Sequence, residues 1–137
     1  MGSVFAEITL KNGSDLVLAQ NGHIAERDIR SLTVNALVDT GAVTLVINED
    51  VCQKLGLSIK GSRTAFLAGG VESPCKVTEP VHICWKNRDA SCRAWVLPGE
   101  GEVLLGVIPL EEMDLAVDPV NRELFGVHGD EAVALIK

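Results

Sequence analysis

Short stretches of alternating apolar and polar residues, separated by turns rich in glycine and asparagine, run along most of the chain. Near the N-terminus, every second residue from position 4 to position 10 is apolar, which is the period of a half-buried β-strand. Residues 11–14 then predict a turn, because their Asn and Gly tolerate positive φ angles. We expect a second strand over residues 16–19, a polar loop over 21–30 and a third strand over 31–38.

The middle of the chain predicts one short helix among several strands. Asn48 is a good N-cap, two acidic residues follow it, and Gly56 suits a helix end, so we expect a helix over residues 49–55. Strands are expected over residues 44–47, 63–67, 72–77, 79–85 and 90–97, with hairpin turns over 68–71 and 86–89.

The last third of the chain predicts short strands and a second brief helix. Residues 103–106 read as a buried strand that ends in glycine, and Pro109 suits the first position of a helix that continues over residues 110–113. Further strands are expected over residues 115–117, 123–125 and 131–136. Many short strands with glycine turns and only two brief helices indicate an all-β, barrel-like domain.

Composition sets the domain count and excludes several partners. A chain of 137 residues that is 47% hydrophobic is long enough for one packed domain over residues 1–137 and hardly long enough for two. A net charge of -7 without a basic run disfavours nucleic-acid and anionic-membrane partners. No apolar run approaches the roughly 20 residues that span a bilayer. The N-terminus has no signal-peptide pattern, so we expect a cytoplasmic protein.

Neither the cysteines nor the histidines form a metal-ligand pattern. The four cysteines have no C-x-x-C spacing, and without an export signal we expect reduced thiols. Cys84 and Cys92 flank a predicted turn and could face each other, but a disulfide or a metal there is disfavoured. His23, His82 and His128 are scattered. The sequence predicts no metal and no cofactor, and Glu111, Glu112 and Asp114 read as the solvated face of a short helix.

The candidate chemistry lies at Asp39-Thr40-Gly41-Ala42, directly after an apolar strand. Apolar surroundings raise the energy of an isolated charged carboxylate. The hydroxyl of Thr40 could fix the turn, and Gly41 would let another chain approach closely. Two such carboxylates a few ångströms apart cannot easily both ionise, so they share a proton and can act as acid and base. The same triplet could also be an ordinary surface turn, and the triplet by itself does not distinguish a catalytic motif from such a turn.

With these residues the sequence resembles the retroviral-protease-like aspartic proteases, particularly their small prokaryotic members, over residues 4–125. Asp39-Thr40-Gly41-Ala42 matches the catalytic motif of that family. Leu67-Ala68-Gly69-Gly70-Val71 falls where the family carries its substrate-binding flap. Leu104-Leu105-Gly106 matches the apolar-apolar-Gly element that packs behind the active-site loop. Three motifs in the right order are far more specific than one.

One departure from the retroviral pattern concerns an ion pair. Retroviral enzymes usually place an Arg after the apolar-apolar-Gly element, paired with an Asp just past the catalytic motif. Here these positions hold Val107 and Val43. Both halves of the pair are missing together, so we expect an apolar contact in its place.

The resemblance implies a retroviral-protease-like closed barrel with one or two short helices, which forms a single-lobe subunit of a C2 homodimer. Because the chain carries one Asp-Thr-Gly motif, Asp39 of each subunit would meet at the twofold axis, and a monomer would be inactive. The terminal strands, residues 4–10 and 132–136, are candidates for pairing across the interface.

The function implied is that of an aspartic endopeptidase acting on a peptide or protein substrate. Water activated between two Asp39 carboxylates would hydrolyse the peptide bond without a metal or a covalent intermediate, at acidic pH. The flap would close over an extended peptide. Two alternatives remain at this point: a non-catalytic dimeric peptide-binding module of the same fold, and a structural β domain whose motif is accidental.

Overall fold

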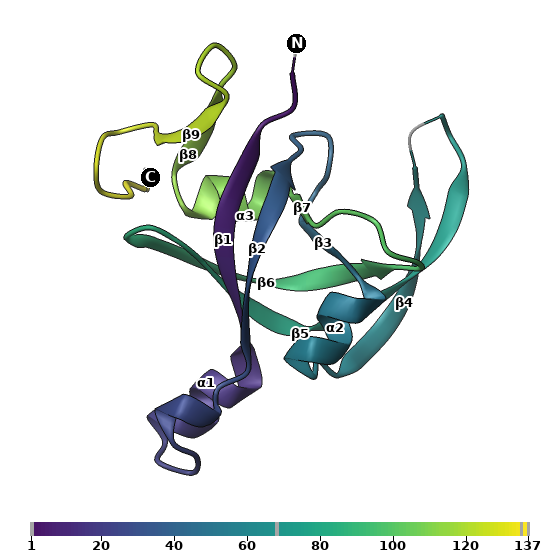
Figure 1. Ribbon diagram of the computed structural model, residues 1–137, viewed down its shortest axis with the longest axis vertical. Coiled ribbons are helices and arrows are strands. Elements are labelled where there is room, and N and C mark those ends of the chain that lie inside the picture. Colours follow the sequence, from purple (N-terminus) through teal and green to yellow (C-terminus); the bar gives the residue numbers. More distant parts are fainter. Residues whose placement is uncertain (1, 68, 135, 137) are drawn as a thin grey trace.

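Six strands close into a barrel because the first strand pairs with two neighbours. The structure is a computed structural model that describes residues 2–67, 69–134 and 136. Its main sheet has the strand order β1-β2-β7-β3-β6-β5-β4, and an additional pairing of β1 with β5 closes the ring (Figure 1). The strands are β1 (Phe5–Asn12), β2 (Ser31–Val38), β3 (Leu45–Asn48), β4 (Ile59–Phe66), β5 (Glu72–Trp85), β6 (Arg88–Leu97) and β7 (Leu104–Leu105). The predicted all-β barrel is confirmed.

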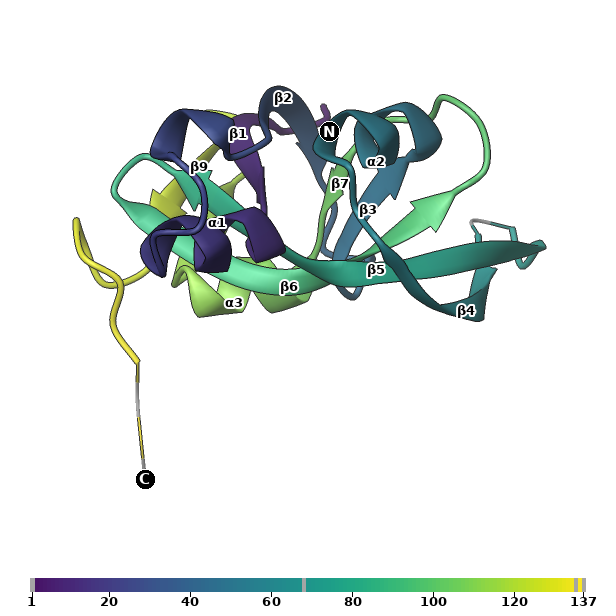
Figure 2. The same ribbon diagram turned by 90° about the horizontal axis from the view of Figure 1, so that it is seen from below.

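The remaining elements are short. They are the helices α1 (Gly13–Gln20), α2 (Glu49–Leu55) and α3 (Val107–Glu112), the 3-10 turn η1 (Glu26–Asp28), and a separate hairpin of β8 (Leu115–Asp118) and β9 (Glu123–Gly126). Figure 2 shows β5 and β6 running along the length of the barrel, with β4 paired outside β5 at one end. No helix in the described part of the chain is long and apolar enough to cross a membrane.

The predicted strand over residues 16–19 is wrong, because these residues belong to α1. The side chain of Asn12 accepts a hydrogen bond from the backbone N–H of Asp15 at 3.0 Å and so caps the helix. Asn12 is fully buried, and its amide also donates to the carbonyl of Leu55 at 2.8 Å. The Asn-Gly pair that predicted a hairpin turn is therefore a helix start, and β1 continues to Asn12.

Two predicted strands, over residues 72–77 and 79–85, form the single strand β5. The turn into β6 occupies only residues 86 and 87, where Lys86 has a φ of 51°. In the resulting register Cys84 lies opposite Asp89 and Cys92 lies opposite Val81, so the two cysteines do not face each other. All four cysteines are free.

The helix predicted over residues 49–55 is confirmed, while two predictions near the C-terminus are wrong. Helix α3 begins at Val107, so Pro109 is its third residue and not its first. That position still lies in the first turn, where backbone N–H groups have no partner within the helix. The strand predicted over residues 131–136 is absent from the described residues 131–134 and 136.

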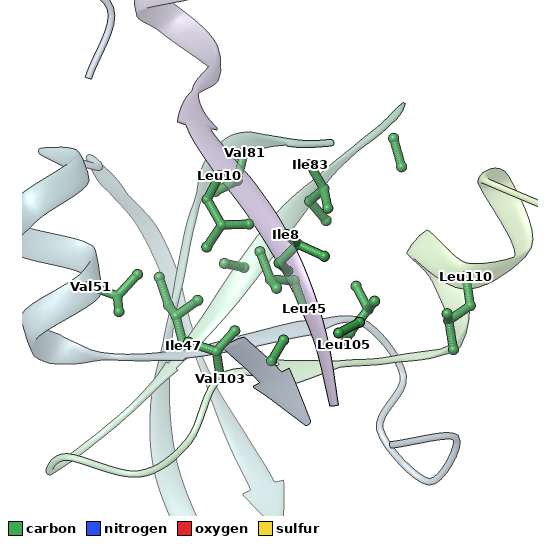
Figure 3. Close-up of a cluster of buried hydrophobic side chains, with 14 of the residues drawn as sticks. Ile8, Leu10, Leu45, Ile47, Val51, Val81, Ile83, Val103, Leu105 and Leu110 are labelled. Carbon is green, nitrogen blue, oxygen red and sulfur yellow. The ribbon is translucent and has the colours of Figure 1, made fainter. Parts of the chain in front are cut away.

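The barrel wall separates a core face from an outer face residue by residue. Leu45 of β3 lies in register with Leu105 of β7 and Ala94 of β6, and all three are fully buried in the core, parts of which Figure 3 shows. The neighbouring residues Val46, Leu104 and Trp95 are also in register with one another. Because side chains alternate along a strand, this second row points away from the core.

This alternation predicts that neighbouring positions on β3 lose different amounts of stability when their side chains are shortened. Replacing Leu45 with alanine removes a buried side chain from the core and should lower the free energy of unfolding by about 2–5 kcal/mol. Val46→Ala removes a half-buried side chain from the other face and should cost clearly less. Urea denaturation of both variants measures the difference, and equal losses would contradict the assigned facing.

Candidate active site

The backbone around Asp39 is fixed by strand β7. At the end of β2, the N–H of Leu37 donates to the carbonyl of Val103 at 2.8 Å, and the N–H of Asp39 donates to the carbonyl of Leu105 at 3.0 Å. Strands β2 and β7 run parallel there. Asp39 therefore lies directly after a strand that backbone hydrogen bonds hold against β7, and its side chain is half-buried.

The Asp39 carboxylate orders its own turn. Its Oδ1 accepts a hydrogen bond from the N–H of Gly41 at 2.9 Å, and its backbone carbonyl accepts one from the N–H of Ala42 at 3.1 Å. A Cβ added to Gly41 would lie 3.1 Å from this Oδ1, so a larger residue would crowd the carboxylate. The hydroxyl of Thr40 is exposed and has no hydrogen-bond partner within the described residues, so it does not fix the turn as expected.

Gly106 lets two backbone segments pack at very short range. A Cβ added there would lie 2.3 Å from the carbonyl oxygen of Thr44 and 2.5 Å from that of Ala42. Just beyond it, the N–H of Val107 donates to the carbonyl of Ala42, and the N–H of Ile108 donates to that of Val43, both at 2.9 Å. Leu104-Leu105-Gly106 thus packs directly behind the loop that carries Asp39.

The positions of the missing ion pair are joined through the backbone. The side chain of Val43 is 60% exposed, and two backbone hydrogen bonds join the two segments, from Val107 to the carbonyl of Ala42 and from Ile108 to the carbonyl of Val43. An apolar contact between the side chains of Val43 and Val107 remains a prediction.

A tight hairpin connects β4 to β5 over residues 67–71. The N–H of Leu67 donates to the carbonyl of Val71 at 2.8 Å, and the N–H of Gly70 donates to that of Leu67 at 3.0 Å. Gly69 and Gly70 have φ angles of 84° and 79°, which glycine adopts without strain. The expected flap residue Ala68 lies outside the described residues.

The loop after β2 and the stem of this hairpin border one cleft of about 730 Å³. Its floor contains the row of side chains that points away from the core. The lining residues are Asp39, Gly41, Ala42, Val43, Thr44, Val46, Thr64, Ala65, Phe66, Leu67, Trp95, Leu97 and Leu104. Among these residues Asp39 carries the one carboxylate, and its surroundings are mostly apolar.

The cleft brings together only part of the predicted site. Asp39, Gly41, Ala42, Leu67 and Leu104 line it, whereas Thr40, Gly69, Gly70, Val71, Leu105 and Gly106 are not among its lining residues. Sequence reasoning left the place of Trp95 open and missed six other lining residues: Thr44, Val46, Thr64, Ala65, Phe66 and Leu97. The strand period could have indicated which residues share a face, but not which strands are neighbours.

Other chemistries find little support in the described part of the chain. No group of three or more His, Cys, Asp and Glu side chains there could hold a metal ion. Burial raises the pKa of all four cysteine thiols, which disfavours the reactive thiolate, and no cysteine lines the cleft. Two histidines each pair with an aspartate: Nδ1 of His128 lies 2.9 Å from Oδ2 of Asp114, and Nε2 of His82 lies 3.2 Å from Oδ2 of Asp89.

Asp114, expected on a solvated helix face, is instead buried. The hydrogen bond from His128 holds the pKa of its carboxyl below the ordinary value, and the N–H of Val133 also donates to it. This cluster joins the start of the β8–β9 hairpin to the chain beyond it, and none of its residues lines the cleft.

Comparison with known proteins agrees with the geometry. A family model described as aspartyl protease matches residues 25–107, a segment that includes Asp39, the hairpin and Gly106. The structure of EIAV protease, a retroviral enzyme in complex with the inhibitor HBY-793, matches with a TM-score of 0.53 and 21% sequence identity. The match covers 77% of this chain and 82% of that one. No curated protein matches. The resemblance to retroviral-protease-like aspartic proteases is confirmed.

The close packing at Gly106 predicts a specific sensitivity to a methyl group. Gly106→Ala would force the Asp39 loop away from β7 and should lower the free energy of unfolding by about 1–3 kcal/mol. Gly101→Ala is the matched control, because a Cβ there meets nothing within 4 Å. Thermal or urea denaturation of the two variants tests this, and equal stability would contradict the close approach.

Proposed function

Because this chain belongs to the aspartyl protease family, we propose that it is an aspartic endopeptidase in which Asp39 activates the attacking water. The observation that carries the proposal is the position of the Asp39 carboxylate. It lies in a largely apolar cleft, is oriented by the N–H of Gly41, and is held on a loop that β7 anchors. A carboxylate in such surroundings is suited to general acid–base catalysis.

One carboxylate is not enough for this reaction. Two carboxylates within a few ångströms share a proton, so one can accept a proton from water while the other donates one to the carbonyl oxygen of the peptide. The water oxygen bonds to the carbonyl carbon, and the resulting diol breaks its bond to nitrogen, which leaves as the amine after receiving a proton. Since the chain supplies a single Asp39, we propose that a second copy supplies the other around a twofold axis.

The surface beside Asp39 supports such a dimer. Val43 is 60% exposed and Ile108 is 47% exposed, and these residues are joined by a backbone hydrogen bond next to the catalytic loop. Phe5, at the start of β1, is 41% exposed. Thr40 is exposed as well. We propose that the partner subunit covers this surface. None of the residues named here belongs to the C-terminal segment that was expected to pair across the interface.

The cleft suits an extended peptide. Its floor consists of Val46, Leu104 and Trp95, and the stem of the β4–β5 hairpin borders it through Phe66 and Leu67. A peptide placed between floor and hairpin could pair as an additional strand, which is a common mode of peptide recognition. The hairpin over residues 67–71 would then act as the flap. Apolar lining favours apolar side chains next to the cleaved bond.

The decisive variant is Asp39→Asn. The amide keeps the size of the side chain but cannot exchange the proton, so peptide cleavage should fall by about a hundredfold to ten-thousandfold. Cleavage of a peptide library from acidic to neutral pH, with mass-spectrometric readout, measures this loss.

Size-exclusion chromatography of both proteins is the control for assembly, because the substitution should leave the dimer largely intact. Equal cleavage by wild type and variant would refute the mechanism. A wild-type dimer that binds peptides but cleaves none would favour the non-catalytic peptide-binding module.

A further inference from the structure

A second, polar pocket adjoins the cleft. It has a volume of about 620 Å³ and is lined by Ser62, Arg63, Thr64, Pro74 and Trp95. Two of these residues, Thr64 and Trp95, also line the main cleft, so the two spaces are adjacent. Asp39 does not line the polar pocket. A peptide bound in the cleft can therefore extend a side chain into this pocket from a position away from the cleaved bond.

Arg63 lines this pocket, as do its neighbours Ser62 and Thr64 on β4. Arg63 and Ala65 are two residues apart on β4, so their side chains leave the same face of the strand. Ala65 is buried and lines the main cleft. Opposite Arg63 on β5 lies Cys75, which is 3% exposed. The side chain of Arg63 therefore leaves the same face of the β4–β5 pair as the buried residues Ala65 and Cys75, although it is itself exposed.

The charge of Arg63 is not matched by a carboxylate. None of the residues that line the polar pocket is acidic, and Arg63 forms no ion pair among the described residues. The contrast with Arg30 is clear, because its Nε lies 2.8 Å from the carboxylate of Asp15. In a chain with a net charge of -7, a cation without an ion pair in the pocket beside the cleft is available for a ligand carboxylate.

We propose that Arg63 is a specificity-determining residue that binds an aspartate or glutamate side chain of the peptide substrate, at a position removed from the cleaved bond. This inference rests on the proposed function and names its substrate class: extended peptides that combine apolar residues around the cleaved bond with an acidic residue further out. In a twofold dimer the pocket occurs once on each side of the cleaved bond, so acidic residues would be favoured on both sides.

The test compares peptide pairs that differ only by Glu or Gln at one position, scanned across both sides of a cleaved bond. For wild type, kcat/KM should be about two- to fivefold higher for the Glu peptide at one outer position on each side, as expected for an ion pair with an exposed arginine. Arg63→Gln should bring this Glu-to-Gln ratio close to one. Arg63→Glu should lower the Glu-to-Gln ratio below one, and a third peptide with Lys at that position should then be cleaved faster than the Gln peptide.

Arg27→Gln is the matched control. It makes the same change in net charge at an exposed position of η1 outside both pockets, so it should keep the wild-type ratio. A Glu-to-Gln ratio near one in wild type, or an unchanged ratio in Arg63→Gln, would overturn the inference.

A binding measurement separates this inference from the proposed function. The same peptide pairs are titrated into the Asp39→Asn protein and into Asp39→Asn combined with Arg63→Gln, with Kd as the readout. Tighter binding of the Glu peptide that is lost in the double variant supports the role of Arg63 even if wild type cleaves nothing. Equal binding of both peptides to Asp39→Asn overturns it, whether or not wild type is a protease.

Discussion

The short approach of Gly106 to the loop after Asp39 is the constraint on which the candidate site depends. Strand β7 has only two residues, yet it lies between β2 and β3 and pairs with both. With Gly106 behind it, the backbone of residues 42–44 can pack at distances that no side chain would permit. Three hydrogen bonds, from Asp39, Val107 and Ile108, then fix the position of the loop that carries Asp39.

The same wall of strands forms part of the core on one face and the floor of the cleft on the other. Leu45, Leu105 and Ala94 face the core, while their neighbours Val46, Leu104 and Trp95 face the cleft. Because one register sets both rows, a slip of one residue would expose the core row and bury the cleft row. Trp95 lines both the cleft and the polar pocket that contains Arg63, so the same register also places one wall of that pocket.

The parts of the structure that depend on neighbouring residues in the sequence could be predicted from the sequence. Asp39-Thr40-Gly41 and Leu104-Leu105-Gly106 are short motifs, and α2 has a clear cap at each end, so these were found. Helix α1 was missed because a short apolar run has no distinct period and because its cap, Asn12, is fixed by a distant carbonyl of Leu55. The cleft floor could not be predicted, since it depends on which strands lie side by side. Thr40 was given a role that the Asp39 carboxylate itself fulfils.

The central claim is that two chains form one active site, and mixing wild type with Asp39→Asn tests it most directly. Total protein concentration is held constant, subunits are allowed to exchange, and the cleavage rate is followed as the wild-type fraction falls. If both Asp39 carboxylates are required, the rate follows the square of that fraction, so an equal mixture retains about a quarter of the activity. A linear decrease, with about half the activity retained, would show that each chain acts alone and would contradict the account.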